Sequence, residues 1–350
     1  MKALTLTADR TLALVDHPKP EPAAADDVVI RVTQSGICGT DRSVLVGKFP
    51  AETGVVMGHE AVGTVDAVGS GVTRFAVGDR VIVNPTLYCG NCPTCLEGHW
   101  NFCGHKAGTE VGLDYDGSFA EFIRLPELFC HAIPDGMDFD RAVVVEPLAC
   151  ALNNIEAGRL AAGETAVVVG GGPMGVVTAM AAQLHGARVL LVEPDPVRRR
   201  LDAEVFEAPE FGGRVTVHTP DDPALAERGD LVVDSVGNLL EQSIGYAAIR
   251  GRVVIMGFNS NASATVRPLT LLQRGLQIIG AGDYNSMIFP KAIELARQLP
   301  LERVVTHRFA LADHEEAFKA LAAVPGTDYA ALKVVLVPPH PEAAHPEEAA

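Results

Sequence analysis

Short apolar runs separated by glycine-containing turns dominate the first 150 residues. Val-rich stretches occur at DVVIRV (27–32), EAVGTVDAVGSGV (60–72) and VGDRVIVNP (77–85). Runs of this length, rich in β-branched residues and bounded by turn residues, predict β-strands. We therefore expect a β-rich first part of the chain.

The pattern changes near residue 150. ETAVVVGGGPMGVVTAMAAQLHGARVLLVEPD (164–195) contains an apolar strand, a glycine turn, an apolar helix closed by Gly186 and a second apolar strand. This is a complete βαβ unit. Strands are expected at 214–218, 230–237, 251–258 and 276–282, with helices at about 239–249 and 287–298. Strands of this kind, alternating with helices, predict a parallel sheet covered on both faces.

These patterns predict an α/β protein with two domains. The first domain is expected over 1–150 and the second over 151–285. A helix in ADHEEAFKALAAV and a strand in ALKVVLVP are expected to return to the first domain over 286–337. The Pro-, Ala- and Glu-rich residues 338–350 predict a disordered tail.

Composition excludes several classes of partner. The net charge of −16 and pI near 5.1 disfavour binding to nucleic acid or to an anionic membrane. No apolar run reaches the roughly 18–20 residues that span a bilayer. Thr, Asp and Arg interrupt the first residues, so no signal peptide is expected. We therefore expect a cytoplasmic protein, whose seven cysteines bind metal or stay reduced.

The glycine turn of the βαβ unit has the spacing G-x-G-x-x-G at Gly170, Gly172 and Gly175, with Pro173 and Met174 between the last two. The first glycine permits the tight turn, the second lets the backbone approach a pyrophosphate, and the third permits close helix–strand packing. The helix N-terminus then faces the phosphates. Within a βαβ unit this motif predicts a dinucleotide site.

The residue that ends the second strand bears on the choice of dinucleotide. Glu193 is expected to bind the adenosine ribose hydroxyls and to repel a 2′-phosphate, which favours NAD. Asp195 is a possible second acidic contact. Arg198, with Arg199 and Arg200, could instead receive a 2′-phosphate, so NADP stays possible. The preferred interpretation makes these three arginines an exposed first helical turn.

Four cysteines with the spacing C-x2-C-x2-C-x7-C form a candidate metal site at about 88–104. They are Cys89, Cys92, Cys95 and Cys103. Four thiolates fill the tetrahedral coordination of zinc and leave no position for a substrate, so this zinc is expected to be structural. His99 and His105 are interpreted as loop or surface residues.

A catalytic zinc needs about three protein ligands and an open position. Cys38, His59 and Glu60 are suitable ligand types, although Cys38 is distant from the other two in sequence. Glu146 could supply a fourth ligand or hold a zinc-bound water. Cys130 and Cys150 are interpreted as core residues.

The ordered motifs GICGTD, GHEAVGTVDAVGSGVTRFAVGDRV, the four-cysteine lobe, DGSFAEF, VEPLA and VVVGGGPMG cover about residues 1–340. With them the chain resembles the zinc-dependent medium-chain dehydrogenases of the alcohol dehydrogenase superfamily. It is most similar to the sorbitol, threonine and cyclitol dehydrogenase branch. Glu60 in GHE and Glu146 in VEPLA point to that branch.

This resemblance implies a GroES-like β-rich catalytic domain and a Rossmann domain with a doubly wound parallel sheet, with the active site in the cleft between them. It implies two Zn²⁺ per chain. Catalytic zinc would bind Cys38, His59 and Glu60, with Glu146 as a direct or water-mediated partner. Thr40 would take the substrate's proton, and Asp41 would hold the ring of His59. Many relatives have a histidine two residues after this aspartate, where this chain has Ser43.

The implied activity is hydride transfer from a secondary alcohol of a polyol, sugar or cyclitol to NAD, giving a ketone. A threonine-type or aminocyclitol substrate is the alternative. The resemblance also implies a homodimer or homotetramer, paired through the edge of the nucleotide sheet. A zinc-ribbon module that binds nucleic acid is disfavoured by the acidic charge. Candidate pocket residues are Phe49, Tyr284 and Asn285.

Overall fold

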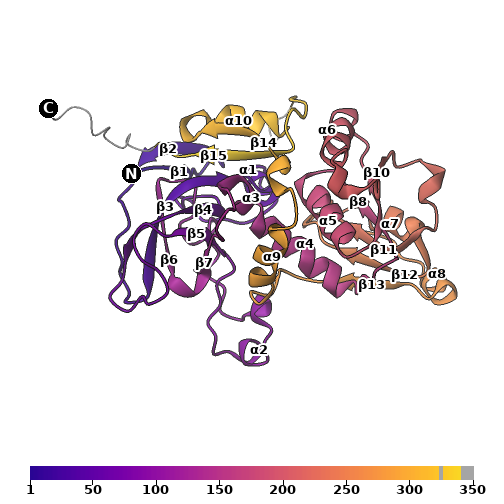
Figure 1. Ribbon diagram of the computed structural model, residues 1–350, viewed down its shortest axis with the longest axis horizontal. Coiled ribbons are helices and arrows are strands. Elements are labelled where there is room, and N and C mark those ends of the chain that lie inside the picture. The colour runs from indigo at the N-terminus through magenta and orange to yellow at the C-terminus, as the bar shows by residue number, and fades with distance from the viewer. Residues whose placement is uncertain (323–325, 340–350) are drawn as a thin grey trace.

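The computed structural model describes residues 1–322 and 326–339. Two sheets form the framework, one at each end of the molecule in Figure 1. Most of the expected tail, residues 340–350, lies outside the described residues. Within the described residues, no helix is both long and apolar enough to cross a membrane.

The first sheet contains seven strands, mostly from the N-terminal part of the chain. Their order is β14-β15-β3-β4-β5-β7, and β6 also pairs with β3. The bounds are β3 (Asp27–Gly36), β4 (Glu60–Val68), β5 (Arg80–Val83), β6 (Phe122–Pro126), β7 (Cys130–Ala132), β14 (Val305–Ala310) and β15 (Lys333–Val337). A separate antiparallel pair is formed by β1 (Lys2–Leu6) and β2 (Leu12–Asp16).

The second sheet is parallel and has six strands in the order β10-β9-β8-β11-β12-β13. In chain order this is 3-2-1-4-5-6, the doubly wound arrangement of dinucleotide-binding domains. The bounds are β8 (Thr165–Val169), β9 (Arg188–Val192), β10 (Val215–His218), β11 (Gly229–Asp234), β12 (Ala247–Ile255) and β13 (Gln277–Gly280).

The helices cover both faces of the second sheet and link the two sheets (Figure 1). Their bounds are α1 (Gly39–Leu45), α2 (Pro93–Leu96), α3 (Phe139–Ala142), α4 (Val145–Ala157), α5 (Pro173–Leu184), α6 (Pro196–Phe206), α7 (Leu240–Tyr246), α8 (Pro268–Arg274), α9 (Ile288–Ala296) and α10 (His314–Ala320). Short 3-10 helices are η1 (Trp100–Phe102), η2 (Glu127–Phe129), η3 (Pro209–Phe211), η4 (Pro223–Leu225), η5 (Leu301–Val304) and η6 (Leu311–Asp313).

The expectation of a β-rich domain joined to a doubly wound sheet is confirmed. One helix boundary is wrong, because the helix expected at about 239–249 ends at Tyr246 and Ala247 already belongs to β12. Ala247 pairs with Gly229 of β11, beyond an irregularity in the register. Pairing with a neighbouring strand therefore overrides the local helical pattern.

The chain passes between the two sheets twice. It leaves the first sheet through α4 and returns through residues 281–286 and α9, after which β14 and β15 complete the first sheet. α4 and α9 contribute to one apolar core together with α5. The domain bounds 1–150, 151–285 and 286–337 stay predictions, and these strand memberships agree with them.

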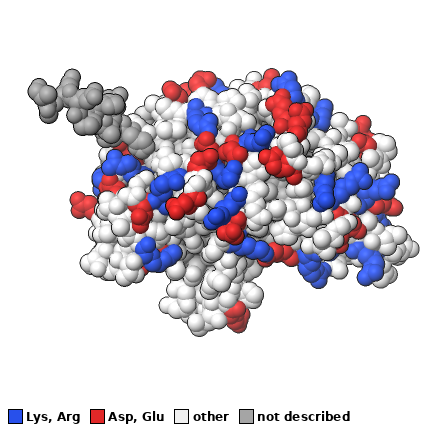
Figure 2. Space-filling model, in the orientation of Figure 1, with Lys and Arg blue, Asp and Glu red and all other residues white. Residues whose placement is uncertain are grey.

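Charges of both signs are mixed over the surface. On the face drawn in Figure 2, Lys and Arg side chains alternate with Asp and Glu and form no continuous basic stripe. The projection at its lower edge, which corresponds to the region of α2 in Figure 1, carries few charged side chains.

Candidate active site and metal centres

Cys38, His59 and Glu60 converge at one end of the first sheet. One potential ligand atom from each lies within 4.8 Å of the others. Cys38 is the N-cap of α1, just after β3, and Glu60 begins β4. Because β3 and β4 are antiparallel with Gly36 opposite Glu60, the end of one strand meets the start of the other. Sheet register therefore assembles a set whose members are separated in sequence.

Glu60 also forms a buried ion pair with Lys333, the first residue of β15. Both side chains are almost fully buried, at 1% and 2% exposure. The pair lies over Gly36, where an added Cβ would overlap the Glu60 carboxylate. The Lys333 ammonium also donates to the carbonyl of Ile37 at 3.0 Å. The sequence interpretation missed Lys333, which is 273 residues from its partner.

Negative groups surround the imidazole of His59. Burial alone disfavours its charged form, but Cys38, Asp41 and Glu146 together raise the pKa of His59 well above its ordinary value. Asp41 is fully buried and accepts a hydrogen bond from the Cys38 backbone N–H at 2.8 Å. Its other oxygen is 3.9 Å from His59 Nδ1, an ion-pair distance rather than a hydrogen bond.

Thr40 and Ser43 both lie on α1. The Thr40 hydroxyl is 3.7 Å from the sulfur of Cys38, so an alcohol bound beside Cys38 would be close to it. Ser43 accepts backbone hydrogen bonds from Lys48 and Phe49 through its carbonyl. Phe49 in turn makes an edge contact with Phe258, which follows β12 of the second sheet.

Glu146 approaches the same centre from α4. Its carboxyl is buried, and burial followed by the like charge of Glu60 raises its pKa to about 7. It is not among the three residues whose ligand atoms cluster. Cys150, one turn further along α4, has its sulfur 3.7 Å from a Glu146 oxygen. Cys150 therefore lies beside the candidate site, whereas Cys130 is a fully buried core residue as expected.

The Cys38–His59–Glu60 set fits a catalytic zinc. It offers one sulfur, one nitrogen and one oxygen, which are the ligand types zinc accepts, and three protein ligands leave a fourth position open. Asp41 Oδ1 is 3.9 Å from His59 Nδ1 and has no hydrogen-bond partner among the described residues, so this carboxylate is available to orient a ligating imidazole.

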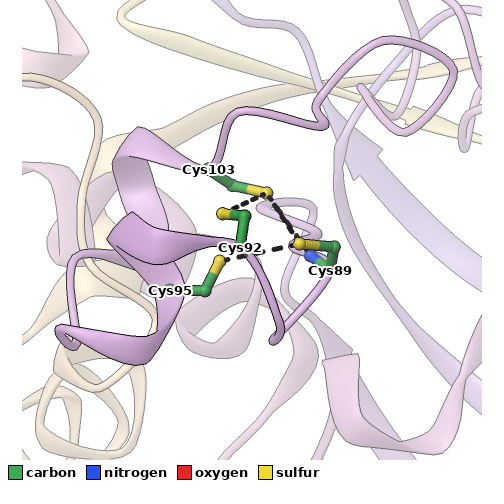
Figure 3. Close-up of side chains that lie close together, drawn as sticks. All are labelled: Cys89, Cys92, Cys95 and Cys103. Atoms are coloured by element: carbon green, nitrogen blue, oxygen red, sulfur yellow. Dashed lines mark hydrogen bonds between the residues drawn. The ribbon is translucent and has the colours of Figure 1, made fainter.

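The second candidate metal centre is formed by four cysteines, Cys89, Cys92, Cys95 and Cys103 (Figure 3). We call the segment that carries them, residues 88–104, the cysteine lobe. The sulfur of Cys89 is 4.0 Å from that of Cys95 and 3.5 Å from that of Cys103, and Cys92 is 4.0 Å from Cys103. Four sulfurs about 2.3 Å from one zinc lie about 3.8 Å apart. The observed spacing therefore fits a closed tetrahedral site.

The cysteines of the lobe differ in how their surroundings shift the pKa of the thiol. The Thr94 hydroxyl and nearby backbone amides lower the pKa of Cys92 to about 5, so this sulfur is a thiolate. Burial followed by the neighbouring sulfurs raises the pKa of Cys95 to about 12. A bound cation would be needed to hold all four sulfurs as thiolates at this spacing. His99 is exposed, and neither it nor His105 joins the cluster.

The glycine turn has the geometry that its sequence predicts. Gly170 has φ of +101°, and a Cβ on Gly175 would overlap the Gly170 carbonyl oxygen. Gly172 is the N-cap of α5, followed by Pro173 and Met174 in its first turn. Glu193 is buried at the end of β9 and accepts a backbone hydrogen bond from Gly171 at 2.7 Å. The carboxylate therefore lies against the turn.

The three arginines after Glu193 differ in environment. Arg198 is 13% exposed, lies 3.9 Å from the Glu193 carboxylate, and stacks 3.5 Å over the ring of Tyr329. Arg199 donates to the carbonyls of Glu193 and Pro194, and Arg200 is the exposed one. The interpretation of an exposed turn therefore fails for Arg198. Asp195 caps α6 by accepting from two backbone amides.

Tyr329 connects the glycine turn to the first domain. It lies between α10 and β15, and the guanidinium of Arg42 on α1 is 5.9 Å from its ring centroid. Arg42, Arg198 and Tyr329 thus bring side chains from both domains together beside the dinucleotide turn. No local sequence pattern pairs these three residues.

Comparisons with known proteins identify the family of the chain. Residues 24–135 match the family model of the alcohol dehydrogenase GroES-like domain, and residues 173–298 match that of zinc-binding dehydrogenase. The chain is 29% identical over 351 residues to a sorbitol dehydrogenase of Halalkalibacterium halodurans, covering 97% of this chain and 99% of that protein. It is 34% identical over 312 residues to a 2-dehydro-3-deoxy-L-galactonate 5-dehydrogenase of Pseudoalteromonas atlantica, covering 84% and 87%.

A solved structure has the same fold over nearly the whole chain. It is the crystal structure of a zinc-binding dehydrogenase from Sinorhizobium meliloti bound to NADP, with a TM-score of 0.85 and 29% identity. The match covers 96% of this chain and 99% of that chain.

Proposed function

The chain belongs to the zinc-dependent medium-chain dehydrogenases of the alcohol dehydrogenase superfamily, and on this premise we propose that it oxidises a secondary alcohol of a polyol, sugar or cyclitol to a ketone with NAD. The observation that carries the proposal is the convergence of Cys38, His59 and Glu60 within 4.8 Å, in a chain that also has a complete dinucleotide turn.

The residues around this centre have separable roles in the proposed reaction. Zinc held by Cys38, His59 and Glu60 would act as a Lewis acid that lowers the pKa of the substrate alcohol. The Thr40 hydroxyl, 3.7 Å from the Cys38 sulfur, accepts the alcohol's proton. Asp41 holds the imidazole of His59 from behind, and Glu146 is a further direct or water-mediated ligand.

The dinucleotide supplies the hydride acceptor, and the protein supplies its orientation. Gly170, Gly172 and Gly175 admit the pyrophosphate, and α5 directs its N-terminus toward it. Glu193 binds the adenosine ribose, and its buried carboxylate disfavours a 2′-phosphate, which supports NAD. Arg198 beside it is the group through which NADP would be accepted.

Two zinc ions per chain are proposed, one catalytic and one in the cysteine lobe. The substrate class is supported by relatives named for sorbitol and for a sugar acid. Ser43 occupies the place where many relatives have a histidine, so the proton leaving Thr40 is proposed to reach water through a ribose hydroxyl of the cofactor.

The direct test is a reduction screen with NAD and NADP on zinc-replete protein. Polyols, inositols, aminocyclitols and threonine form the substrate panel. We expect turnover with at least one polyol or cyclitol, and a higher kcat/KM with NAD than with NADP. Turnover of threonine or an aminocyclitol alone would replace the proposed substrate class, and no turnover of any secondary alcohol would overturn the proposal.

The role of the catalytic set is tested by Cys38→Ser. Loss of one ligand should lower kcat by at least about 10³-fold, because the alcohol is then no longer activated. Metal analysis should still find one zinc per chain, held by the cysteine lobe. Loss of both zinc ions from this variant would contradict the assignment of two independent sites.

A further inference from the structure

The cysteine lobe contacts the segment through which the chain returns from the second sheet. This segment, residues 281–286, joins β13 to α9 and is called the return segment below. In Figure 1 the lobe, marked by α2, projects from the lower edge of the molecule. Nothing in the proposed reaction explains why the lobe should contact this segment.

Four contacts from the region of the lobe hold the return segment. Asn101 donates to the Asp283 carbonyl at 2.9 Å, and Lys106 pairs with the Asp283 carboxylate at 2.7 Å. Asn285 donates to the Gly98 carbonyl at 2.6 Å. The ring of Phe102 lies against Gly282, where an added Cβ would come within 2.8 Å of it.

The shape of the lobe depends on its cysteines. Gly98 and Asn101 lie between Cys95 and Cys103, on the turn and the 3-10 helix that the four sulfurs hold together. Trp100, the single tryptophan of the chain, stacks on Tyr88 with ring centroids 4.9 Å apart and donates to the Cys95 carbonyl. The groups that bind the return segment are therefore positioned by the same fold that brings the sulfurs together.

The return segment in turn extends toward the candidate catalytic centre. Tyr284 is 3% exposed, and its hydroxyl donates to Asn84 Oδ1 at 3.0 Å. Tyr284 belongs to the same buried apolar core as Val145, Leu148 and Ala149, the residues of α4 that flank Glu146. Asn153 of α4 lies 3.3–3.4 Å from the carbonyls of residues 281–283.

We propose that the cysteine lobe positions the catalytic centre through the return segment, with Tyr284 and Asn84 as positioning residues for the Glu146 end of α4. The lobe itself takes no part in the chemistry. Loss of its metal loosens residues 98–101, then the return segment, and then the packing of Tyr284 against α4. This inference rests on the proposed function for its effect on turnover, but the structural coupling does not depend on any substrate.

The structural coupling is tested by hydrogen exchange of the full-length protein. Asn101→Ala and Asn285→Ala each remove one contact while all four cysteines remain, and Cys92→Ser removes a lobe ligand. We expect amides of residues 281–287 to exchange about tenfold faster in all three variants, the effect of losing one hydrogen bond. Glu97→Ala, an exposed lobe residue that makes none of these contacts, is the matched control and should not change exchange.

The effect on catalysis is tested by Tyr284→Phe and Asn101→Ala. Both should lower kcat by about 10- to 100-fold, since small misplacements of reacting groups carry penalties of this size. The KM for NAD should stay within about twofold, because the glycine turn is untouched. Trp100 fluorescence should remain that of the native protein in Tyr284→Phe, which separates a displaced catalytic centre from an unfolded lobe.

Unchanged exchange at 281–287 in Asn101→Ala, Asn285→Ala and Cys92→Ser would overturn the inference and leave the proposed function intact. Native kcat in Tyr284→Phe and Asn101→Ala would also overturn it. Accelerated exchange in a protein that oxidises no secondary alcohol would support the coupling and overturn the proposed function. Asn101→Ala and Asn285→Ala keep the test decisive if Cys92→Ser does not fold.

Discussion

At the scale of single residues, the candidate catalytic centre depends on buried charges that compensate one another. Glu60 is a proposed zinc ligand, and its charge is balanced by Lys333 above Gly36. Glu146 and Asp41 are buried within the same centre, and the side chain of His59 is 12% exposed. Removing one charge from such a group leaves its partner unpaired in the interior.

Lys333→Met should therefore destabilise the zinc-free protein strongly. Breaking a buried ion pair by removing one partner costs about 3–5 kcal/mol, because the Glu60 carboxylate would remain buried and uncompensated. The free energy of unfolding in urea, measured after metal removal, checks this. The double variant Glu60→Gln/Lys333→Met should recover much of the loss. A single variant as stable as the native chain would show that the pair is unimportant.

Asp202 is a buried carboxyl outside the candidate catalytic centre. It is fully buried on α6 beside Gly171, and neither of its oxygens has a hydrogen-bond partner among the described residues. Burial, together with the like charge of Glu193, raises its pKa to about 8 from an ordinary value of 3.8. Between about pH 4 and pH 8 the Asp202 carboxyl therefore keeps its proton in the folded chain, whereas in the unfolded chain it has lost it.

By linkage, this group makes the free energy of unfolding fall as pH rises from about 4 to about 8, with no further fall above pH 8. Asp202→Asn removes that contribution. At about 1.4 kcal/mol per pH unit, we expect the variant to be more stable than the native chain by about 1–2 kcal/mol at pH 5 and by about 4–6 kcal/mol at pH 8. Urea unfolding across this pH range measures the difference, and a difference independent of pH would refute the assignment.

At the scale of elements, the strand–turn–helix unit of β8 and α5 is the part most constrained by backbone contact. The Gly175 Cα faces the Gly170 carbonyl so closely that no side chain fits between them. The turn must keep this geometry for the backbone amides and the N-terminus of α5 to face a pyrophosphate.

Gly175→Ala should therefore weaken NADH binding by at least about tenfold, since the added methyl group forces the turn open. Titration of NADH fluorescence measures the affinity. Gly245→Ala is the matched control, because this exposed glycine on α7 has open space around its Cα. The control should bind NADH normally and be stabilised by about 0.5–1 kcal/mol. Equal affinities of the two variants would contradict the role of the turn.

At the scale of the whole molecule, the active site depends on how two sheets are joined. Among the described residues, side chains that meet across the domains include Arg198 with Tyr329, Phe49 with Phe258, and those of the cysteine lobe with residues 282–286. β13 closes one edge of the second sheet and has β12 as its sheet neighbour. Unpaired strand edges of this kind offer backbone groups to a second chain.

We propose a homodimer or homotetramer paired through β13. Light scattering coupled to size exclusion should therefore give a mass of two or four times 36.9 kDa at micromolar concentration. Ile278→Lys, which adds a charge to the edge strand, should shift the population toward the single chain. A native mass of 36.9 kDa at every concentration would exclude this pairing.

Local patterns in the sequence predict much of this protein. The glycine turn, the strand and helix around it and the four-cysteine lobe depend on residues within about 30 positions of one another. Their spacing alone therefore predicts a dinucleotide turn and a closed metal site. Residue type made Cys38, His59 and Glu60 candidate zinc ligands, the resemblance to a family assigned them to one catalytic zinc, and their ligand atoms converge in the structure.

Tertiary structure decided which distant residues meet. Lys333 reaches Glu60 because β15 and β4 both flank β3, and Tyr284 reaches Asn84 across 200 positions because the chain returns beside the cysteine lobe. Tyr284 and Asn285, which stay predicted pocket residues, form hydrogen bonds with Asn84 and Gly98. The sequence by itself thus determined the chemistry of each motif, since that chemistry depends on residue type and short spacing. Strand order and domain packing determined which charges are paired and which metal-binding segment supports the catalytic centre.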